Sequence, residues 1–454
     1  MSRFFKAYIE WVRRILPTPL SIAFLLTIIT VCAIALYGDI NENRFDFIGR
    51  VWSDGLWQPN LLVFAVQMML ILVLGHILAL SPIVAKLINL IVKPCTTTAR
   101  AAALVSFFTI LVGLFNWGLG LIFGAILARK VGEKAHAEKR EINYPLIGAA
   151  GYTGMLVWHG GFSGSSLIKV AEKGHLSELM GTGFTGEIPQ LITLNQTMFS
   201  SMNIAASLAL ILLIPFFLFL IASFSKTSHI AIKPHVFDHP QTDELIGAER
   251  LDHSAYFIKG IGAIIVLYCF KLMYLDLGFL NYFNPNNINL LLLGLALFFH
   301  RSISSFSNAL DQAIQGASGI LIQFPLYFGI LALMNESGLV SRLAAWFIEH
   351  SSVISYPVYT FISAGLVNLF VPSGGGQWAI QGPIIIQSSL ELGIPLHKSI
   401  LAMAYGDEVT NMLQPFWALP LLGITRLKAR DILPYTLLLF LAGSIVFLSC
   451  LLIF

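Results

Sequence analysis

The chain has 454 residues, of which 56% are apolar and 11% are charged, and its formal net charge is +3. Average soluble domains carry about 25% charged residues, so this composition and the mean hydropathy of +0.78 exclude an ordinary soluble protein and predict one multi-pass membrane domain. The basic residues form no stripe of the kind that binds nucleic acid, and four well-separated cysteines predict buried free thiols.

The first apolar run, residues 17–37, follows two arginines. It is longer than the ~7–15 apolar residues of a signal peptide, so we expect a retained span. Lys and Arg flank membrane spans on the cytoplasmic side, which predicts a cytoplasmic N-terminus. We expect a polar outer loop at 38–59, a returning span at Asn60–Leu80, and an amphipathic segment at 83–92 suited to the membrane interface.

Residues 101–128 are an apolar run with basic residues beyond both ends. One crossing cannot join two cytoplasmic ends, and two crossings need about 40 residues. We therefore expect a re-entrant hairpin that turns at Asn116-Trp117-Gly118. The next run, Tyr144–Val170, is interrupted by the glycine- and serine-rich stretch His159–Ser166, which predicts a discontinuous helix.

The middle of the chain alternates between polar segments and apolar runs. The expected elements are an outer loop at 171–196, a span at Ser201–Ser223, a cytoplasmic linker at 226–254, a connecting span at 255–275, a span at 288–299, an interfacial segment at 302–315, a span at 316–334, and a second amphipathic helix at 339–348.

The stretch Val371–Pro383 holds three consecutive glycines and two prolines between apolar runs. Irregular backbone at membrane depth is tolerated only where protein or a water-filled cavity covers it. We therefore expect a second re-entrant hairpin over Val353–Leu390, entered from outside. Ser399–Ile424 should be a helix broken at Gly406–Asn411, and Ile432–Phe454 should end on the periplasmic side.

Two halves of the chain show the same order of elements. They match at a shift of 256 residues, so that Gly118 falls on Gly374. The connecting span between them reverses the second half. This predicts two inverted-topology repeats, about 17–224 and about 288–454, the design of secondary transporters that bind substrate at the midplane.

The hairpin tip at residues 373–376 and the break at 163–165 are the expected substrate site. Free backbone N–H groups and hydroxyls at a helix start bind carboxylates. The alternatives are a flexible surface loop at the tip, close helix packing through small residues at the break, and a packed structural histidine. The substrate-binding candidates are Ser373, Gly374, Gly375, Gly376, Gln377, Trp378, Ser163, Gly164, Ser165 and His159.

Asp407 and Glu408 are two acids inside an apolar run, and intramembrane acids are usually functional. With Thr410 and Asn411 they offer oxygen ligands for sodium or a site for a proton. Adjacent residues point in different directions on a helix, so both acids serve one site only if the helix is unwound. The alternative is a structural pair with Lys398 or with a tip hydroxyl.

Four motifs of the chain resemble those of the short-chain fatty acid transporter family, within the wider ion transporter superfamily. They are Phe115-Asn116-Trp117-Gly118, His159-Gly160-Gly161-Phe162-Ser163-Gly164-Ser165, Val371-Pro372-Ser373-Gly374-Gly375-Gly376-Gln377-Trp378, and Gly406-Asp407-Glu408 followed by Asn411-Met412-Leu413-Gln414-Pro415-Phe416-Trp417. The resemblance covers essentially the whole chain.

This resemblance implies an all-α transporter of the bacterial inner membrane that takes up short-chain fatty acids such as acetoacetate and butyrate. It also implies inverted repeats, a homodimer, an elevator-like motion, and often sodium held by hairpin tips and broken helices. By analogy Asn116 joins the coupling-cation candidates, and Ser163, Ser165, Ser373 and Asn411 lie near the site.

We therefore expect a secondary active transporter rather than an enzyme, with membrane lipid and a short-chain acid as partners, no nucleic acid partner, and no cofactor or metal apart from Na⁺ as an alternative to H⁺ for coupling. The acyl chain should rest on Trp378, Trp417 or Phe416. One alternative is a carrier for another carboxylate of the superfamily. The other is an intramembrane serine protease that uses Ser163, with His159 nearby on the same helix as a base.

Overall fold

The chain is built of helices, and the described part contains no strand. The computed structural model describes residues 2–15, 17–38, 40, 42–180, 187–225, 227, 247–276, 282 and 284–454. Six helical stretches in these ranges are long and apolar enough to cross a membrane: α2 (Pro19–Tyr37), α4 (Pro59–Leu80), α6 (Thr98–Phe115), α11 (Ser201–Phe224), α13 with the π-helical turn η2 (Ala255–Asp276), and α23 (Ala429–Ile453). The predicted all-α membrane fold is confirmed.

Prolines set several helix boundaries where the sequence predicts them. The break at Ser81-Pro82 separates α4 from α5 (Pro82–Val92), because a proline is accommodated best in the first turn of a helix. In the second half the expected elements appear as α15 (Pro285–Phe299), α16 (Ile303–Ala313), α17 (Ser318–Glu336) and α18 (Leu339–Glu349).

Two helices of the N-terminal region do not follow from the hydropathy pattern. The segment expected as an outer loop contains α3 (Arg44–Leu56), whose Gly55 packs against α17: an ideal Cβ there would lie 2.6 Å from Ala332 Cβ. The other is α1 (Ser2–Ile15), where the Tyr8 hydroxyl donates to the carbonyl of Pro434 on α23. Both are stabilised by contacts with distant segments.

The polar connections are only partly described. The predicted outer loop at 171–196 contains α10 (His175–Met180), and its residues 181–186 lie outside the described residues. Most of the predicted cytoplasmic linker, residues 228–246, also lies outside them, and α12 (Glu249–Asp252) follows.

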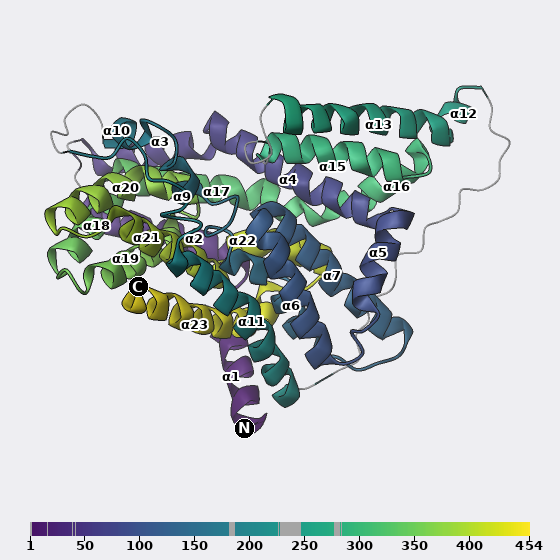
Figure 1. Cartoon of the computed structure of the whole chain (residues 1–454), viewed down its shortest axis with the longest axis horizontal. Helices are drawn as coiled ribbons and strands as arrows, with labels where there is room; N and C mark the ends of the chain where they lie inside the picture. Colours follow the sequence, from purple (N-terminus) through teal and green to yellow (C-terminus); the bar gives the residue numbers. More distant parts are fainter. Residues whose placement is uncertain are drawn as a thin grey trace.

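Each half of the chain contains one helical hairpin (Figure 1). In the first, α6 and α7 (Trp117–Ala137) join at Asn116 and pack so closely that an ideal Cβ on Gly120 would lie 2.6 Å from Gly113 Cα. In the second, α19 (Tyr356–Phe370) and α20 (Gly374–Glu391) join through residues 371–373. The chain thus turns at both glycine tips.

The first discontinuous segment is less helical than expected. Within Tyr144–Val170 the regular parts are α8 (Tyr144–Ala150), η1 (Thr153–Leu156) and α9 (Ser165–Lys169). The helix therefore already ends at Gly151, eight residues before the predicted break begins at His159. Close contact explains this, since an ideal Cβ on Gly151 would lie 2.5 Å from the carbonyl oxygen of Gly124 on α7.

The second break lies further along the chain than predicted. α21 (Leu396–Thr410) is continuous through Gly406, and the interruption comes at η4 (Asn411–Leu413) before α22 (Pro415–Thr425). The predicted discontinuous helix is present, but its interruption begins only at Asn411, the last residue of the predicted stretch Gly406–Asn411. Gly406 permits close helix packing instead, because its ideal Cβ would lie 2.1 Å from the Phe361 carbonyl oxygen on α19. Pro415 sets the actual break.

The order of helix, short helix, hairpin, broken helix and long helix recurs in both halves. Between them, α13 lies beside α15 at one edge of the molecule (Figure 1), with an ideal Cβ on Gly262 only 2.5 Å from Phe298 N. The inverted relationship of the repeats and their bounds stay predictions.

Candidate functional site

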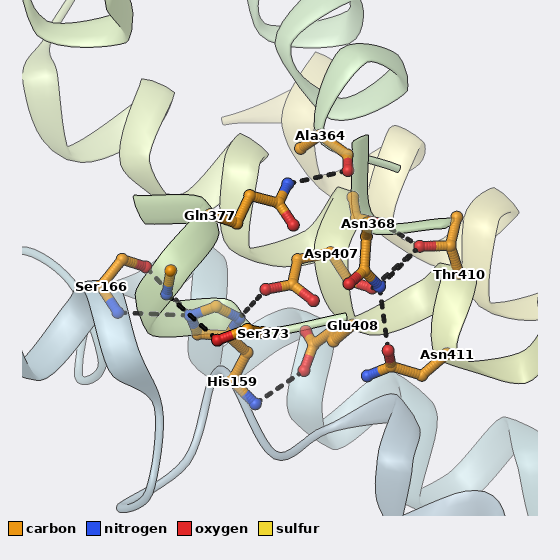
Figure 2. Close-up of polar contacts among 12 residues, drawn as sticks. His159, Ser166, Ala364, Asn368, Ser373, Gln377, Asp407, Glu408, Thr410 and Asn411 are labelled. Atoms are coloured by element: carbon orange, nitrogen blue, oxygen red, sulfur yellow. Dashed lines mark hydrogen bonds and ion pairs between the residues drawn. The ribbon is translucent and has the colours of Figure 1, made fainter. Parts of the chain in front are cut away.

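The second glycine tip lies directly on the first broken segment (Figure 2). An ideal Cβ on Gly374 would be 2.9 Å from Trp158 Cη2, 3.0 Å from Asp407 Oδ2 and 3.1 Å from His159 Cε1. Only glycine allows the backbone of α20 to start this close to those three side chains. The tip and two of the predicted polar residues therefore form one site.

His159 is the centre of this site and contacts both predicted acids. Its Nδ1 is 3.2 Å from Asp407 Oδ2, an ion-pair distance without hydrogen-bond alignment, while its backbone N–H donates to Glu408 Oε2 at 2.9 Å. The side chains of His159, Asp407 and Glu408 are at most 1% exposed. Asp407 contacts the imidazole ring and Glu408 accepts from the backbone N–H, so two adjacent residues of a continuous helix reach the same histidine.

The two acids lack a Lys or Arg partner in the described part of the chain. Among the described residues neither Asp407 nor Glu408 pairs with Lys or Arg, so the structure does not show the alternative pair with Lys398. Nor does the described part hold a group of three or more His, Cys, Asp or Glu arranged as a metal site. An ionised carboxyl group that is buried without a paired cation is costly.

Ser166, the last residue of the predicted break His159–Ser166, joins the site. Its hydroxyl lies 3.1 Å from His159 Nε2 and its backbone N–H 3.3 Å from the same atom. Gly164 packs closely against His159, since an ideal Cβ on Gly164 would be 2.0 Å from the His159 carbonyl oxygen. Because the chain between His159 and Ser165 is not helical, no helical periodicity could have signalled that Ser166 folds back onto the imidazole.

Ser163 and Asn116 both cap the second helix of the first hairpin. Asn116 Oδ1 accepts from Leu119 N at 3.1 Å, and Ser163 Oγ accepts from Trp117 N at 3.0 Å. These contacts satisfy N–H groups that a helix start leaves unpaired. Ser163 therefore faces the first tip, while the ring of His159, the base that a serine protease would need, meets Ser166 instead.

Asn368 in α19 is a functional candidate that the sequence did not indicate. Its Nδ2 lies within hydrogen-bond distance of the Asp407 carbonyl (2.7 Å), Asn411 Oδ1 (2.9 Å) and Thr410 Oγ1 (3.0 Å). Its own carbonyl accepts from the Gln414 side chain. One amide thus holds the end of α21 and the break after it against the hairpin.

Gln377 and Trp378 face other parts of the structure. Gln377 Nε2 donates to the Ala364 carbonyl at 2.8 Å and to Gln381 Oε1 at 2.7 Å, inside the hairpin. Trp378 Nε1 donates to His175 Nε2 at 3.0 Å, toward the segment that precedes α11. Neither side chain lines the cavity at Ser373, so the structure does not bring these two candidates together with the rest.

A cavity of about 180 Å³ opens at Ser373. Ser373 Oγ accepts from Gly376 N at 3.2 Å, which leaves the hydroxyl hydrogen free to donate. Of the three aromatic residues expected against an acyl chain, Phe416 lines the cavity. The lining residues are Leu61, Phe64, Tyr327, Phe328, Leu331, Pro372, Ser373 and Phe416. The cavity is therefore mostly apolar with a polar group at the tip.

Comparison with known proteins agrees with the motifs of this site. The profile of the family described as "Short chain fatty acid transporter" matches residues 1–454. The chain belongs to the short-chain fatty acid transporter family. One curated family relative, named "Putative short-chain fatty acid transporter", from Escherichia coli (strain K12), is 36% identical over 100% of this chain and 99% of its own length. A relative of the same name from Haemophilus influenzae is 36% identical over 96% of this chain and 95% of its own.

The solved structure of the YdaH transporter from Alcanivorax borkumensis also matches, with a TM-score of 0.44 and 16% identity over 95% of this chain and 98% of that one. The predicted membership of the short-chain fatty acid transporter family is confirmed by the profile and the relatives. With its apolar helices, this family member is a multi-pass membrane transporter, a protein that binds a small-molecule substrate within lipid.

Proposed function

We propose that this family member imports short-chain fatty acids, such as acetoacetate and butyrate, by cation-coupled alternating access around the α19–α20 tip. One observation carries the proposal: Ser373, the residue that caps α20, borders an apolar cavity while Gly374 touches the buried pair of Asp407 and His159. Substrate site and charge-compensation site thus share one hairpin tip.

The carboxylate would bind at the start of α20. The first N–H groups of a helix have no intrahelical acceptor and favour an anion. Gly375 supports this use, because nothing lies within 4 Å of its ideal Cβ, so the backbone there is open to a ligand. The hydroxyl of Ser373 adds a donor, and the hydrocarbon chain would lie on Phe64 and Phe416 in the apolar part of the cavity.

The two buried acids would provide the coupling. Moving an anion inward against the membrane potential costs about 2.3 kcal/mol per charge per 100 mV. A sodium ion or a proton that enters with the substrate offsets this cost. Asp407 Oδ2 and Asn368 Oδ1 are buried oxygens without a hydrogen-bond partner in the described part of the chain, and both are suited to a hard cation or a proton.

The proposal also includes the finer architecture. The hairpins and broken helices would move as one elevator-type unit within two inverted repeats, in a homodimer of the bacterial inner membrane. The N-terminus would be cytoplasmic and the C-terminus periplasmic. No cofactor takes part, apart from Na⁺ if sodium is the coupling ion.

Purified protein in proteoliposomes tests the function. Uptake of labelled acetoacetate and butyrate would be measured with sodium and pH gradients imposed separately. Ser373→Ala should raise the KM of both acids roughly tenfold or more, because hydrogen bonds to charged groups are worth about 1.5–3 kcal/mol. The matched control is Ser223→Ala; within the described residues the Ser223 hydroxyl donates to the Phe219 carbonyl of its own helix. An unchanged KM in folded Ser373→Ala would refute the site.

A carrier for a larger or more highly charged carboxylate is the remaining alternative. Such a carrier needs fixed cationic groups near the site, and the residues that line the cavity include no Lys or Arg. Competition of a dicarboxylate with butyrate uptake separates the two. We expect a hundredfold excess of the dicarboxylate not to compete, which corresponds to an affinity difference of about 2.7 kcal/mol.

A further inference from the structure

Tyr327 lies in the middle of α17 and lines the same cavity as Ser373. These two residues carry the only polar side chains among the residues that line it. Tyr327 is 2% exposed, and its hydroxyl has no hydrogen-bond partner among the described residues. A buried hydroxyl without a partner is costly and rare in native proteins, so each case calls for an explanation.

The tyrosine ring is held in place by its neighbours. It meets Phe416 edge-on, with ring centroids 4.8 Å apart, and Phe416 in turn stacks on Phe324 at 4.1 Å. Aromatic pairs of this geometry are stabilising and restrict the rings. The ring is therefore fixed in the wall of the cavity, and its unsatisfied hydroxyl is the polar group that α17 contributes there.

A ligand that binds as proposed already has partners for its carboxylate. The Ser373 hydroxyl and the free N–H groups at the start of α20 are donors suited to an anion. A phenol on a different helix offers one neutral donor and acceptor. It fits a single uncharged oxygen carried further along the substrate.

We propose that Tyr327 is a specificity residue that favours short-chain acids with an oxo or hydroxy group on the hydrocarbon chain over unsubstituted acids of equal length. This inference rests on the proposed function. A carbonyl oxygen would accept from the phenol, and a hydroxyl would donate to it or accept from it. A site built to bond such an oxygen rejects the analogue that lacks it, because the buried group is then left unpaired.

The test compares three four-carbon acids: acetoacetate, 3-hydroxybutyrate and butyrate. In wild-type proteoliposomes the KM of the two oxygenated acids should be about tenfold below that of butyrate, in the range of one buried hydrogen bond. Tyr327→Phe should abolish this difference and leave the KM of butyrate unchanged or lower. Ser373→Ala should raise the KM of all three acids alike.

Tyr144→Phe is the matched control, because it also removes one buried hydroxyl but far along the chain, where Tyr144 donates to the Thr425 carbonyl at 3.0 Å. Its ratio of KM values should equal that of the wild type. Melting temperatures in detergent, with and without each acid, report folding and give a second measure of binding that does not depend on transport.

Each other outcome overturns the inference. An equal rise in KM for all three acids in Tyr327→Phe would place the phenol on the carboxylate, and unchanged ratios would leave it without a role in selection. If wild-type protein neither takes up nor is stabilised by any of the acids, the proposed function fails as well. If it transports all three without preference, only the inference about Tyr327 fails.

Discussion

His159 and Asp407 lie 3.2 Å apart, measured from Nδ1 to Oδ2, although 248 sequence positions separate them. His159 belongs to a non-helical segment, whereas Asp407 belongs to the continuous helix α21. Gly374 covers this pair with its backbone. If the α19–α20 tip moves as proposed, a carboxylate and an imidazole would be exposed or buried with it, which would link the proposed substrate site to the proposed coupling site.

Loss of the imidazole should destabilise the protein. In His159→Gln the Asp407 carboxyl group stays buried without the imidazole beside it, and leaving a buried polar group without its partner costs about 1–3 kcal/mol. We expect a clearly lower melting temperature in detergent. The control is His397→Gln, at the partly exposed start of α21. Equal melting temperatures for both variants would show that the contact adds no stability.

Two neighbouring glycines of the tip should respond very differently to alanine. Gly374→Ala puts a methyl group about 3 Å from Trp158, Asp407 and His159, whereas the position of the added atom in Gly375→Ala meets nothing within 4 Å. Overpacking of this kind costs about 1–3 kcal/mol. The melting temperature in detergent should fall in Gly374→Ala and stay close to wild type in Gly375→Ala; the reverse order would contradict the close contact at the tip.

Removal of the Asn368 amide should loosen the joint between α19 and α21. Asn368→Ala leaves the partners of that amide, Thr410 and Asn411 among them, without their donor, at a cost of about 1–3 kcal/mol. The melting temperature should drop, and the dependence of uptake on the imposed cation gradient should weaken. Asn89→Ala, which removes an exposed amide of α5, serves as the control. Unaltered cation dependence in Asn368→Ala would separate this residue from coupling.

The link between His175 and Trp378 should depend on pH. Burial, followed by the positive charge of Lys169, lowers the pKa of His175, against the opposing effect of Glu172 and Glu178. Only the neutral ring accepts from the indole N–H at Nε2. Because the folded pKa lies below the unfolded value of about 6.5, the contribution to stability is complete above the unfolded value and is lost as the pH falls through the folded pKa.

His175→Gln provides the measurement for this pH effect, because glutamine keeps an acceptor that does not titrate. Between pH 7.5 and about pH 5.5, below the ordinary histidine pKa of about 6.5, the melting temperature of the wild type should fall more steeply than that of the variant. Parallel curves for the two proteins would argue against the titration of this contact.

Much of the fold follows from local sequence chemistry. The lengths of the apolar runs predict the spans, because a helix must be about 20 residues long to cross the hydrocarbon core. The hairpin turns follow from residues that end one helix and start the next, as Asn116 and Ser373 do through side-chain bonds to N–H groups three residues on. Asp407 and Glu408 stand out because charges in apolar runs are rare.

The contacts between distant polar residues could not be predicted from the sequence. The contact of Ser166 with His159, the position of Asn368 against α21, and the inclusion of Tyr327 in the cavity wall all depend on how helices pack in three dimensions. The second break also lies at Asn411–Leu413 instead of at Gly406, since that glycine serves close contact with α19. Apolar length and capping residues act within a few positions of the chain, so the sequence alone determined most of the membrane helices and both hairpin turns. Only the tertiary structure decided which polar groups meet, because a hydrogen bond between distant segments leaves no periodic pattern.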